Sequence, residues 1–179
     1  MKTHILPRIR VCLAAAALIV APAIAGAQES KLPERIQVAW GPTDKLSEVK
    51  DNPMQRGWLR PEEWQKDIGN FIRERADVIL PPGQRLDITI DDIKLAGDFE
   101  PWHGSNAWDI RILKDTYPPR IDLHYRLATA DGSTLREGSE KLRDMAYLQR
   151  TVTTSTDPLR YDKRMIEEWL RAEFRGPKA

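Results

Sequence analysis

The chain has 179 residues, 31% of them charged, and a formal net charge of +1. Its one cysteine, Cys12, lies near the N-terminus, which excludes disulfide bridges and cysteine metal ligands from the rest of the chain. No long block of one charge occurs, which argues against nucleic acid binding and against a polybasic membrane-surface patch.

Residues 1–27 have the pattern of a secretory signal peptide. Three basic residues come first, an apolar run follows over 11–21, and small residues precede a cut after Ala27 or, as the alternative, after Ala25. A retained membrane anchor is the other interpretation, but the apolar run is short for a spanning helix and is followed at once by Pro22. We therefore expect an exported protein.

Cleavage after Ala27 leaves 152 of the 179 residues, enough for one hydrophobic core. The leader removes three of the 28 basic residues and none of the 27 acidic ones, so the mature chain has a formal charge of −2. We expect a flexible lead-in over 28–35 and a single soluble domain over 36–175, with no membrane span in the mature protein.

The first part of this domain predicts a strand, a helix and a second strand. Apolar residues alternate over 36–40, as in a half-buried strand, and the charged stretch 43–60 predicts a long surface loop. Pro61 opens a helix with apolar residues on one face, which ends at the Pro-Pro-Gly turn over 81–83. Strand alternation over 85–93 then allows a right-handed parallel crossover.

The second part predicts mainly antiparallel structure. Residues 108–113 form a short edge strand, and strands over 121–127 and 135–142 make a hairpin around an Asp-Gly turn. Asp157 is the N-cap of a closing amphipathic helix. The predicted fold class is α+β, a two-layer sandwich with two amphipathic helices on one face of a four- to five-stranded, mostly antiparallel sheet.

Segment 97–120 is the candidate binding region. It contains Trp102, His103 and Trp108 among Gly, Pro, Asn and Ser residues. The two tryptophans could stack on a sugar or anchor a protein partner, or they could instead cover the end of the sandwich.

Arg120 closes this segment and follows two prolines, which hold it on a stiff stretch of backbone. One role for its guanidinium is a bidentate grip on a carboxylate or phosphate. The other is an ion pair with Asp115 or Asp122.

Enzymatic signatures are absent from the sequence: we find no phosphate-binding loop, nucleophile elbow or zinc-protease motif. His103 has Asp98, Glu100 and Asp109 nearby, and such a set could hold a divalent ion with an open position. Its spacing matches no known pattern, and we interpret His124 as an exposed cross-strand partner. We therefore assign no catalytic residue, no metal site and no cofactor.

Five runs in the sequence resemble an uncharacterised exported proteobacterial family, the domain of unknown function 3016. They are LPPGQ at 80–84, IDDIKLAG at 90–97, FEPW at 99–102, YPPRI at 117–121 and DPLRY at 157–161. The resemblance covers nearly the whole mature chain. It implies a location in the periplasm or envelope of a Gram-negative bacterium, and it brings no activity, cofactor or catalytic residue.

The leading hypothesis is a non-enzymatic periplasmic module that docks an envelope protein or a small ligand through the loop over 97–120. Trp102, Trp108, Arg120 and His103 are its candidate binding residues. The alternatives are a small metal-dependent hydrolase that uses His103 with nearby carboxylates, and a purely structural envelope component.

Overall fold

The computed structural model describes residues 34–52, 59–103, 110–150 and 156–175, within one compact unit over 31–179. The predicted signal peptide, and most of the predicted lead-in, lie outside the described residues. Among the described ranges, no helix combines the length and the apolar character that crossing a membrane requires.

Four strands form the main sheet: β1 (Ile36–Trp40), β2 (Gln84–Lys94), β5 (Arg120–Thr129) and β6 (Thr134–Arg143). Their order in the sheet is β1-β2-β5-β6. β1 runs parallel to β2, whereas the β2–β5 and β5–β6 pairs are antiparallel. The sheet is therefore mostly antiparallel, as the sequence predicts.

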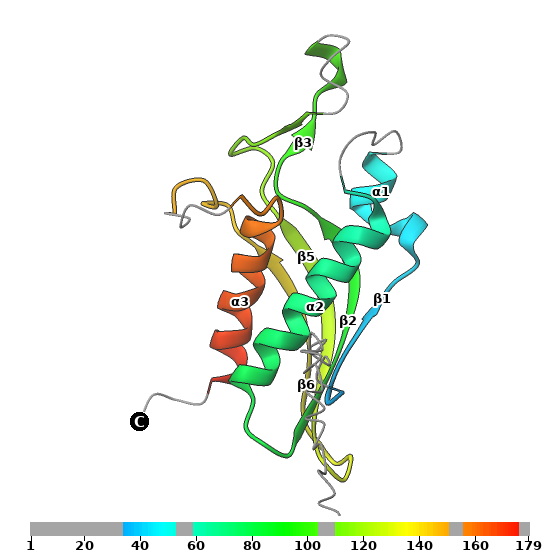
Figure 1. Cartoon of the computed structure of the whole chain (residues 1–179), viewed down its shortest axis with the longest axis vertical. Coiled ribbons are helices and arrows are strands. Elements are labelled where there is room, and N and C mark those ends of the chain that lie inside the picture. Colours follow the sequence, from blue (N-terminus) through cyan, green and yellow to red (C-terminus); the bar gives the residue numbers. More distant parts are fainter. Residues whose placement is uncertain (1–33, 53–58, 104–109, 151–155, 176–179) are drawn as a thin grey trace, which may run out of the picture. The chain divides into compact units, whose positions relative to one another are not determined.

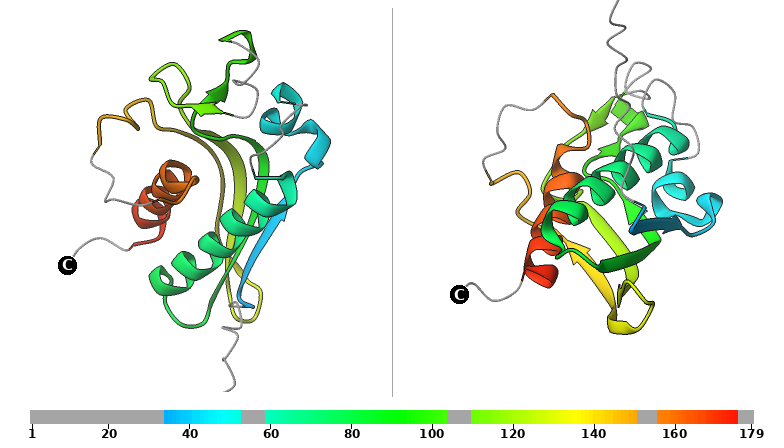
Figure 2. Two further views of the ribbon diagram at one scale, coloured as in Figure 1. Left: turned by 45° about the horizontal axis from the view of Figure 1, so that its top comes forward. Right: turned by 60° about the horizontal axis from the view of Figure 1, so that its bottom comes forward.

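Two helices cover one face of this sheet, α2 (Pro61–Ile79) and α3 (Arg160–Phe174) (Figure 1). The sheet curves around them, so both helices lie on its inner side (Figure 2). Apolar side chains of the helices and of the inward sheet face make one buried core, which includes Trp64, Ile68, Ile72, Leu86, Ile88, Ile90, Leu123, Ile166 and Leu170. The predicted two-layer α+β sandwich is confirmed.

The lead-in ends before Arg35, because this residue is tied to the fold. Its guanidinium donates hydrogen bonds to the carboxylate of Asp77 at 2.6 Å and to the carbonyls of Asp77 and Pro81 at 2.7 and 2.8 Å. The side chain thereby joins the start of β1 to the end of α2.

The prediction of a surface loop over 43–60 is wrong for its first part. A 3-10 turn, η1 (Thr43–Lys45), and a short helix, α1 (Ser47–Asp51), occupy this stretch. Both the amide and the hydroxyl of Ser47 donate to the carboxylate of Asp92, each at 2.7 Å. These two bonds fix α1 against β2, a long-range partner that local composition does not reveal.

The predicted edge strand over 108–113 is also corrected. Of residues 108–113 the structure describes 110–113, and among these only Arg111–Ile112 form a strand, β4. It pairs with β3 (Asp98–Phe99) in a separate two-stranded sheet. Gly97 precedes β3 with φ at +83°, a left-handed conformation that suits glycine. That turn directs the chain away from the main sheet, so β4 cannot extend it.

The closing helix begins at Arg160 and not directly after the predicted N-cap, Asp157. The carboxylate of Asp157 accepts a hydrogen bond from the amide of Leu159 at 2.8 Å and contacts the ammonium of Lys163 at 2.6 Å. Asp157 therefore stabilises the turn that leads into α3 and does not cap the helix itself.

Candidate functional site

A pocket of about 340 Å³ lies where β2 ends, β5 begins and α1 approaches both strands. Most of its lining comes from the two ends of segment 97–120 and from charged side chains of neighbouring elements. The lining residues are Asp51, Lys94, Gly97, Asp98, Thr116, Tyr117, Pro118, Arg120, Arg143 and Met145.

Arg120 stands at the first position of β5 and its side chain is 43% exposed. Among the described residues, the nearest carboxylate oxygen belongs to Asp51 and lies 4.0 Å from the guanidinium, beyond hydrogen-bonding distance. The alternative role, an ion pair with Asp115 or Asp122, is not formed among the described residues, and the carboxylate of Asp122 contacts Arg143 at 2.7 Å.

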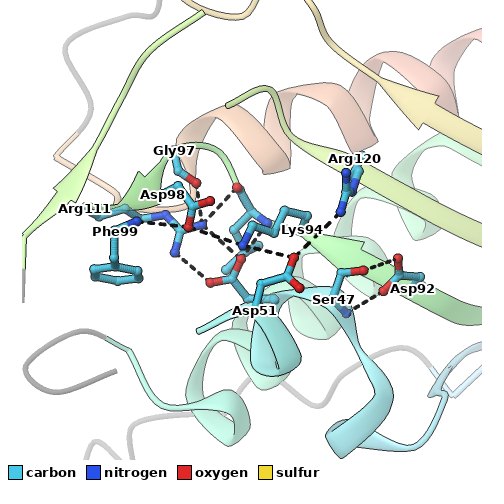
Figure 3. A network of polar contacts seen from close by, with 11 residues as sticks. Ser47, Asp51, Asp92, Lys94, Gly97, Asp98, Phe99, Arg111 and Arg120 are labelled. Carbon is cyan, nitrogen blue, oxygen red and sulfur yellow. Dashed lines mark hydrogen bonds and ion pairs between the residues drawn. The ribbon is translucent and has the colours of Figure 1, made fainter. Parts of the chain in front are cut away.

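Lys94, the last residue of β2, is held deeper in the site with its side chain 10% exposed. Its ammonium lies 3.3 Å from the carboxylate of Asp98 and 3.5 Å from that of Asp51 (Figure 3). The amide of Asn52, oriented so that both its ends are satisfied, accepts from Lys94 at 2.8 Å and donates to Asp98 at 3.1 Å. Lys94 is thus strongly committed to partners within the protein.

Tyr117 forms another part of the pocket lining, and its hydroxyl is held by a buried carboxylate. Its hydroxyl donates to the buried carboxylate of Glu100 at 2.7 Å, and the ammonium of Lys114 contacts the same carboxylate at 2.6 and 2.8 Å. The hydrogen bond to Glu100, together with burial, raises the pKa of the Tyr117 hydroxyl above its ordinary value. The two ends of segment 97–120 are therefore joined by a polar anchor.

Glu48 of α1 and Arg111 of β4 form a buried ion pair. The side chain of Glu48 is fully buried and that of Arg111 is 6% exposed, and their closest atoms lie 2.7 Å apart. Arg111 also donates to the carbonyls of Leu95, Ala96 and Gly97 at 2.9, 2.7 and 3.0 Å. Its guanidinium thus fastens β4 to the backbone of residues 95–97, of which Gly97 lines the pocket.

Asp162 of α3 reaches the same backbone from the helix layer. Its carboxylate accepts a hydrogen bond from the amide of Ala96 at 3.0 Å. Burial raises the pKa of Asp162 to about 7, although the positive charge of Arg111 acts in the opposite direction. The backbone that leads to Gly97 in the pocket wall is therefore held by acidic and basic side chains of α1, β4 and α3.

Of the four predicted binding residues, the structure describes the side chains of two, Arg120 and Trp102. Arg120 lines the pocket, whereas Trp102 lies in a 3-10 turn, η2 (Pro101–His103), is 70% exposed and is not part of the lining. Trp108 and the side chain of His103 lie outside the described residues, so their roles stay predictions. In the part of the chain that is described, no group of three His, Cys, Asp or Glu residues could hold a metal ion.

His124 lies on the outer face of the sheet, away from both helices. Its Nδ1 is 2.9 Å from the carboxylate of Asp91 on β2, and both side chains are about half exposed. Arg126 and Asp87 make a similar pair at 2.9 Å on the same two strands. His124 is therefore a cross-strand partner, as the alternation of β5 predicts.

Sequence reasoning missed Asp51, Lys94 and the buried pair of Glu48 with Arg111. Glu48 stands in a charged stretch whose composition indicates exposure, and Lys94 ends a strand in a position where solvent is the ordinary expectation. The one available signal was the alternation around Arg111, which placed it in a strand without revealing its partner.

Fold and site together define an α+β domain with a charged pocket at one end of its sheet. A family model described as "Protein of unknown function (DUF3016)" matches residues 34–172, and the chain belongs to this family. No curated protein and no solved structure matches the chain.

Proposed function

We propose that the chain is an exported, periplasmic, non-enzymatic binding protein that holds a small ligand at the base of segment 97–120. The observation that carries this proposal is the pocket of about 340 Å³ with the half-exposed guanidinium of Arg120 in its wall. Its volume is near the lower end of the range for small-molecule sites, about 300–1,000 Å³.

The contacts that hold the residues of the pocket wall in place support a binding role. Asp98 and Tyr117, from opposite ends of segment 97–120, are each held by polar contacts, Asp98 to Lys94 at 3.3 Å and Tyr117 to Glu100 at 2.7 Å. A pocket whose walls are already fixed loses little conformational entropy when a ligand enters. The geometry thus favours binding without a large rearrangement.

Export is supported by the leader pattern over 1–27 and is tested by expressing the full chain with its own leader in a Gram-negative host. We expect the protein in the periplasmic fraction, with Gln28 at the mature N-terminus. An uncleaved chain in the cytoplasmic fraction would refute export.

Ligand binding is tested by the melting temperature of the protein recovered from that fraction, against a panel of neutral, cationic and anionic small molecules. A ligand at 100 times its dissociation constant adds about 2.7 kcal/mol, which raises the melting temperature by several degrees. We expect at least one class to do so and Arg120→Ala to abolish the effect. A shift that Arg120→Ala leaves intact would refute the pocket as the site.

Docking of an envelope protein is a second candidate, favoured by the 70% exposure of Trp102 on η2. Exposed tryptophans are frequent anchors of protein interfaces. Crosslinking in the periplasm tests it, with Trp102→Ala expected to remove a specific product and Val78→Ala, an exposed apolar change on α2, expected to retain it. Identical crosslinking of both variants would exclude docking through Trp102.

A further inference from the structure

The pocket contains one acidic side chain that is weakly held between two cations. Asp51, the last residue of α1, lies 3.5 Å from the ammonium of Lys94 and 4.0 Å from the guanidinium of Arg120 (Figure 3). Both distances exceed those of charge-assisted hydrogen bonds, about 2.7–2.9 Å. The Asp51 side chain is also 49% exposed, so water screens both contacts.

The other acidic groups around Arg120 are held by shorter bonds. Asp92 accepts two hydrogen bonds from Ser47 at 2.7 Å, Asp98 accepts from its neighbouring amide at 3.0 Å, and Asp122 contacts Arg143 at 2.7 Å. Asp51 is therefore the carboxylate whose displacement from the pocket breaks the weakest contacts among those described.

Of the three cationic side chains that line the pocket, Arg120 has the most hydrogen-bond donors without a described acceptor. A guanidinium has five N–H donors, and no hydrogen bond from the Arg120 side chain to another described residue is formed. Its planar fork matches the two oxygens of a carboxylate or two oxygens of a phosphate. Lys94 and Arg143 also line the pocket, so cationic side chains outnumber the acidic ones, Asp51 and Asp98.

The rest of the lining is less polar. Tyr117 and Pro118 lie beside Arg120 in the wall, and Met145 is 66% exposed at the same pocket. An aromatic ring, a proline ring and a thioether side chain together suit a small apolar group attached to the anion.

We propose that the ligand of this pocket is a small organic anion whose carboxylate or phosphate binds Arg120 and takes the place of Asp51 between Lys94 and Arg120. This inference rests on the proposed function and names its ligand class. Asp51 acts as an internal competitor that balances the two cations while the pocket is empty and lowers the affinity for anions that bind weakly.

The test is calorimetric titration of the processed protein, obtained by expressing the full chain with its own leader. The probes are benzoate, phenyl phosphate and inorganic phosphate, and benzamide is the neutral analogue. Benzoate or phenyl phosphate is expected to bind and benzamide is not. Stronger binding of benzoate assigns a carboxylate ligand, and stronger binding of phenyl phosphate or inorganic phosphate assigns a phosphate. Arg120→Gln should weaken binding at least about tenfold, because a charge-assisted bond is lost.

Asp51→Asn gives the sharper result, since removal of the competitor should tighten anion binding about threefold. Arg126→Gln, on the outer sheet face, is the matched control and should change nothing. Anion binding that Asp51→Asn fails to tighten, or that Arg120→Gln fails to weaken, overturns the inference. Equal binding of benzamide also overturns the anion inference, but it leaves the proposed binding function intact. If every probe fails to bind and no compound of the panel raises the melting temperature, both the anion inference and the proposed binding function are overturned.

Discussion

The carboxylate of Glu48 meets the guanidinium of Arg111 at 2.7 Å, although 63 positions separate the two residues in the sequence. Neither side chain is more than 6% exposed. Two charges removed from water are stable only when each is well paired, and here the backbone carbonyls of 95–97 complete the pairing. This ion pair attaches α1 and β4 to the backbone that leads to Gly97 in the pocket wall.

Breaking the pair leaves one buried charge without its partner. We predict that Glu48→Gln and Arg111→Met each lower the free energy of unfolding by about 3–5 kcal/mol, measured by urea denaturation. The double variant should cost less than the sum of the two single variants, because the second change removes the charge left behind by the first.

Arg126→Met is the control for this cycle, since its exposed pair with Asp87 should contribute less than about 1 kcal/mol. Strictly additive effects of Glu48→Gln and Arg111→Met would show that the two side chains do not interact in solution.

Asp162 makes the stability of the fold depend on pH near neutrality. Its pKa is raised from 3.8 to about 7, so between these values the folded state binds a proton that the unfolded state has released. Stability from this group is therefore greatest at low pH and falls as the pH rises through this window, by at most about 1.4 kcal/mol per pH unit.

Asp162→Asn removes this titration and retains an oxygen that accepts from the amide of Ala96. Relative to the unmodified protein, the variant should gain stability steadily between pH 5 and pH 7 in urea titrations, because in this window the unfolded chain has released the Asp162 proton and the folded protein still holds it. A stability difference that stays constant with pH would contradict the raised pKa.

Gly97 is required by both its conformation and its surroundings. Its φ is +83°, and an added Cβ would lie 2.8 Å from the carbonyl oxygen of Ile112 and from a methyl group of Leu113. We predict that Gly97→Ala lowers the free energy of unfolding by at least about 2 kcal/mol. Gly83 has a similar φ of +81° with nothing within 4 Å, so Gly83→Ala should cost only about 1 kcal/mol. Equal losses would mean that contact with β4 is unimportant.

Gly138 in β6 makes room for an aromatic ring. An added Cβ would lie 3.0–3.2 Å from the ring and hydroxyl of Tyr125, which also packs edge-to-face against Trp169 and Phe174. Since this ring is held on several sides, Gly138→Ala should destabilise the protein by about 1–3 kcal/mol, as measured by thermal unfolding. Ser139→Ala, on the opposite face of β6, should be nearly neutral, and a stabilising Gly138→Ala would refute the packing argument.

The sequence alone was sufficient for the elements whose pattern is local. Alternation over β2 and β5 and the apolar face of α2 predict the sheet and the helix layer, because burial of one face imposes that period. The positions of α1 and β4 could not be predicted in this way. Each is held by a long-range polar partner, Asp92 for Ser47 and Glu48 for Arg111, which a charged stretch of sequence does not disclose.

The candidate site was predictable to a similar extent. Arg120 was identified because two prolines precede it, and it does line the pocket. Asp51 and Lys94 escaped notice, since their importance depends on how α1 and the end of β2 meet in space. Trp102 was noted for its residue type, but the described structure places it on η2 and outside the pocket lining.

The most direct test of the proposed anion site is a map of backbone amide chemical shifts during titration of the processed protein with benzoate or phenyl phosphate. We expect the largest changes at Asp51, Lys94, Tyr117 and Arg120, with the outer-face residues His124 and Arg126 unaffected. Changes concentrated on the outer face, or spread evenly over the sheet, would contradict a binding site at the junction of α1, β2 and β5.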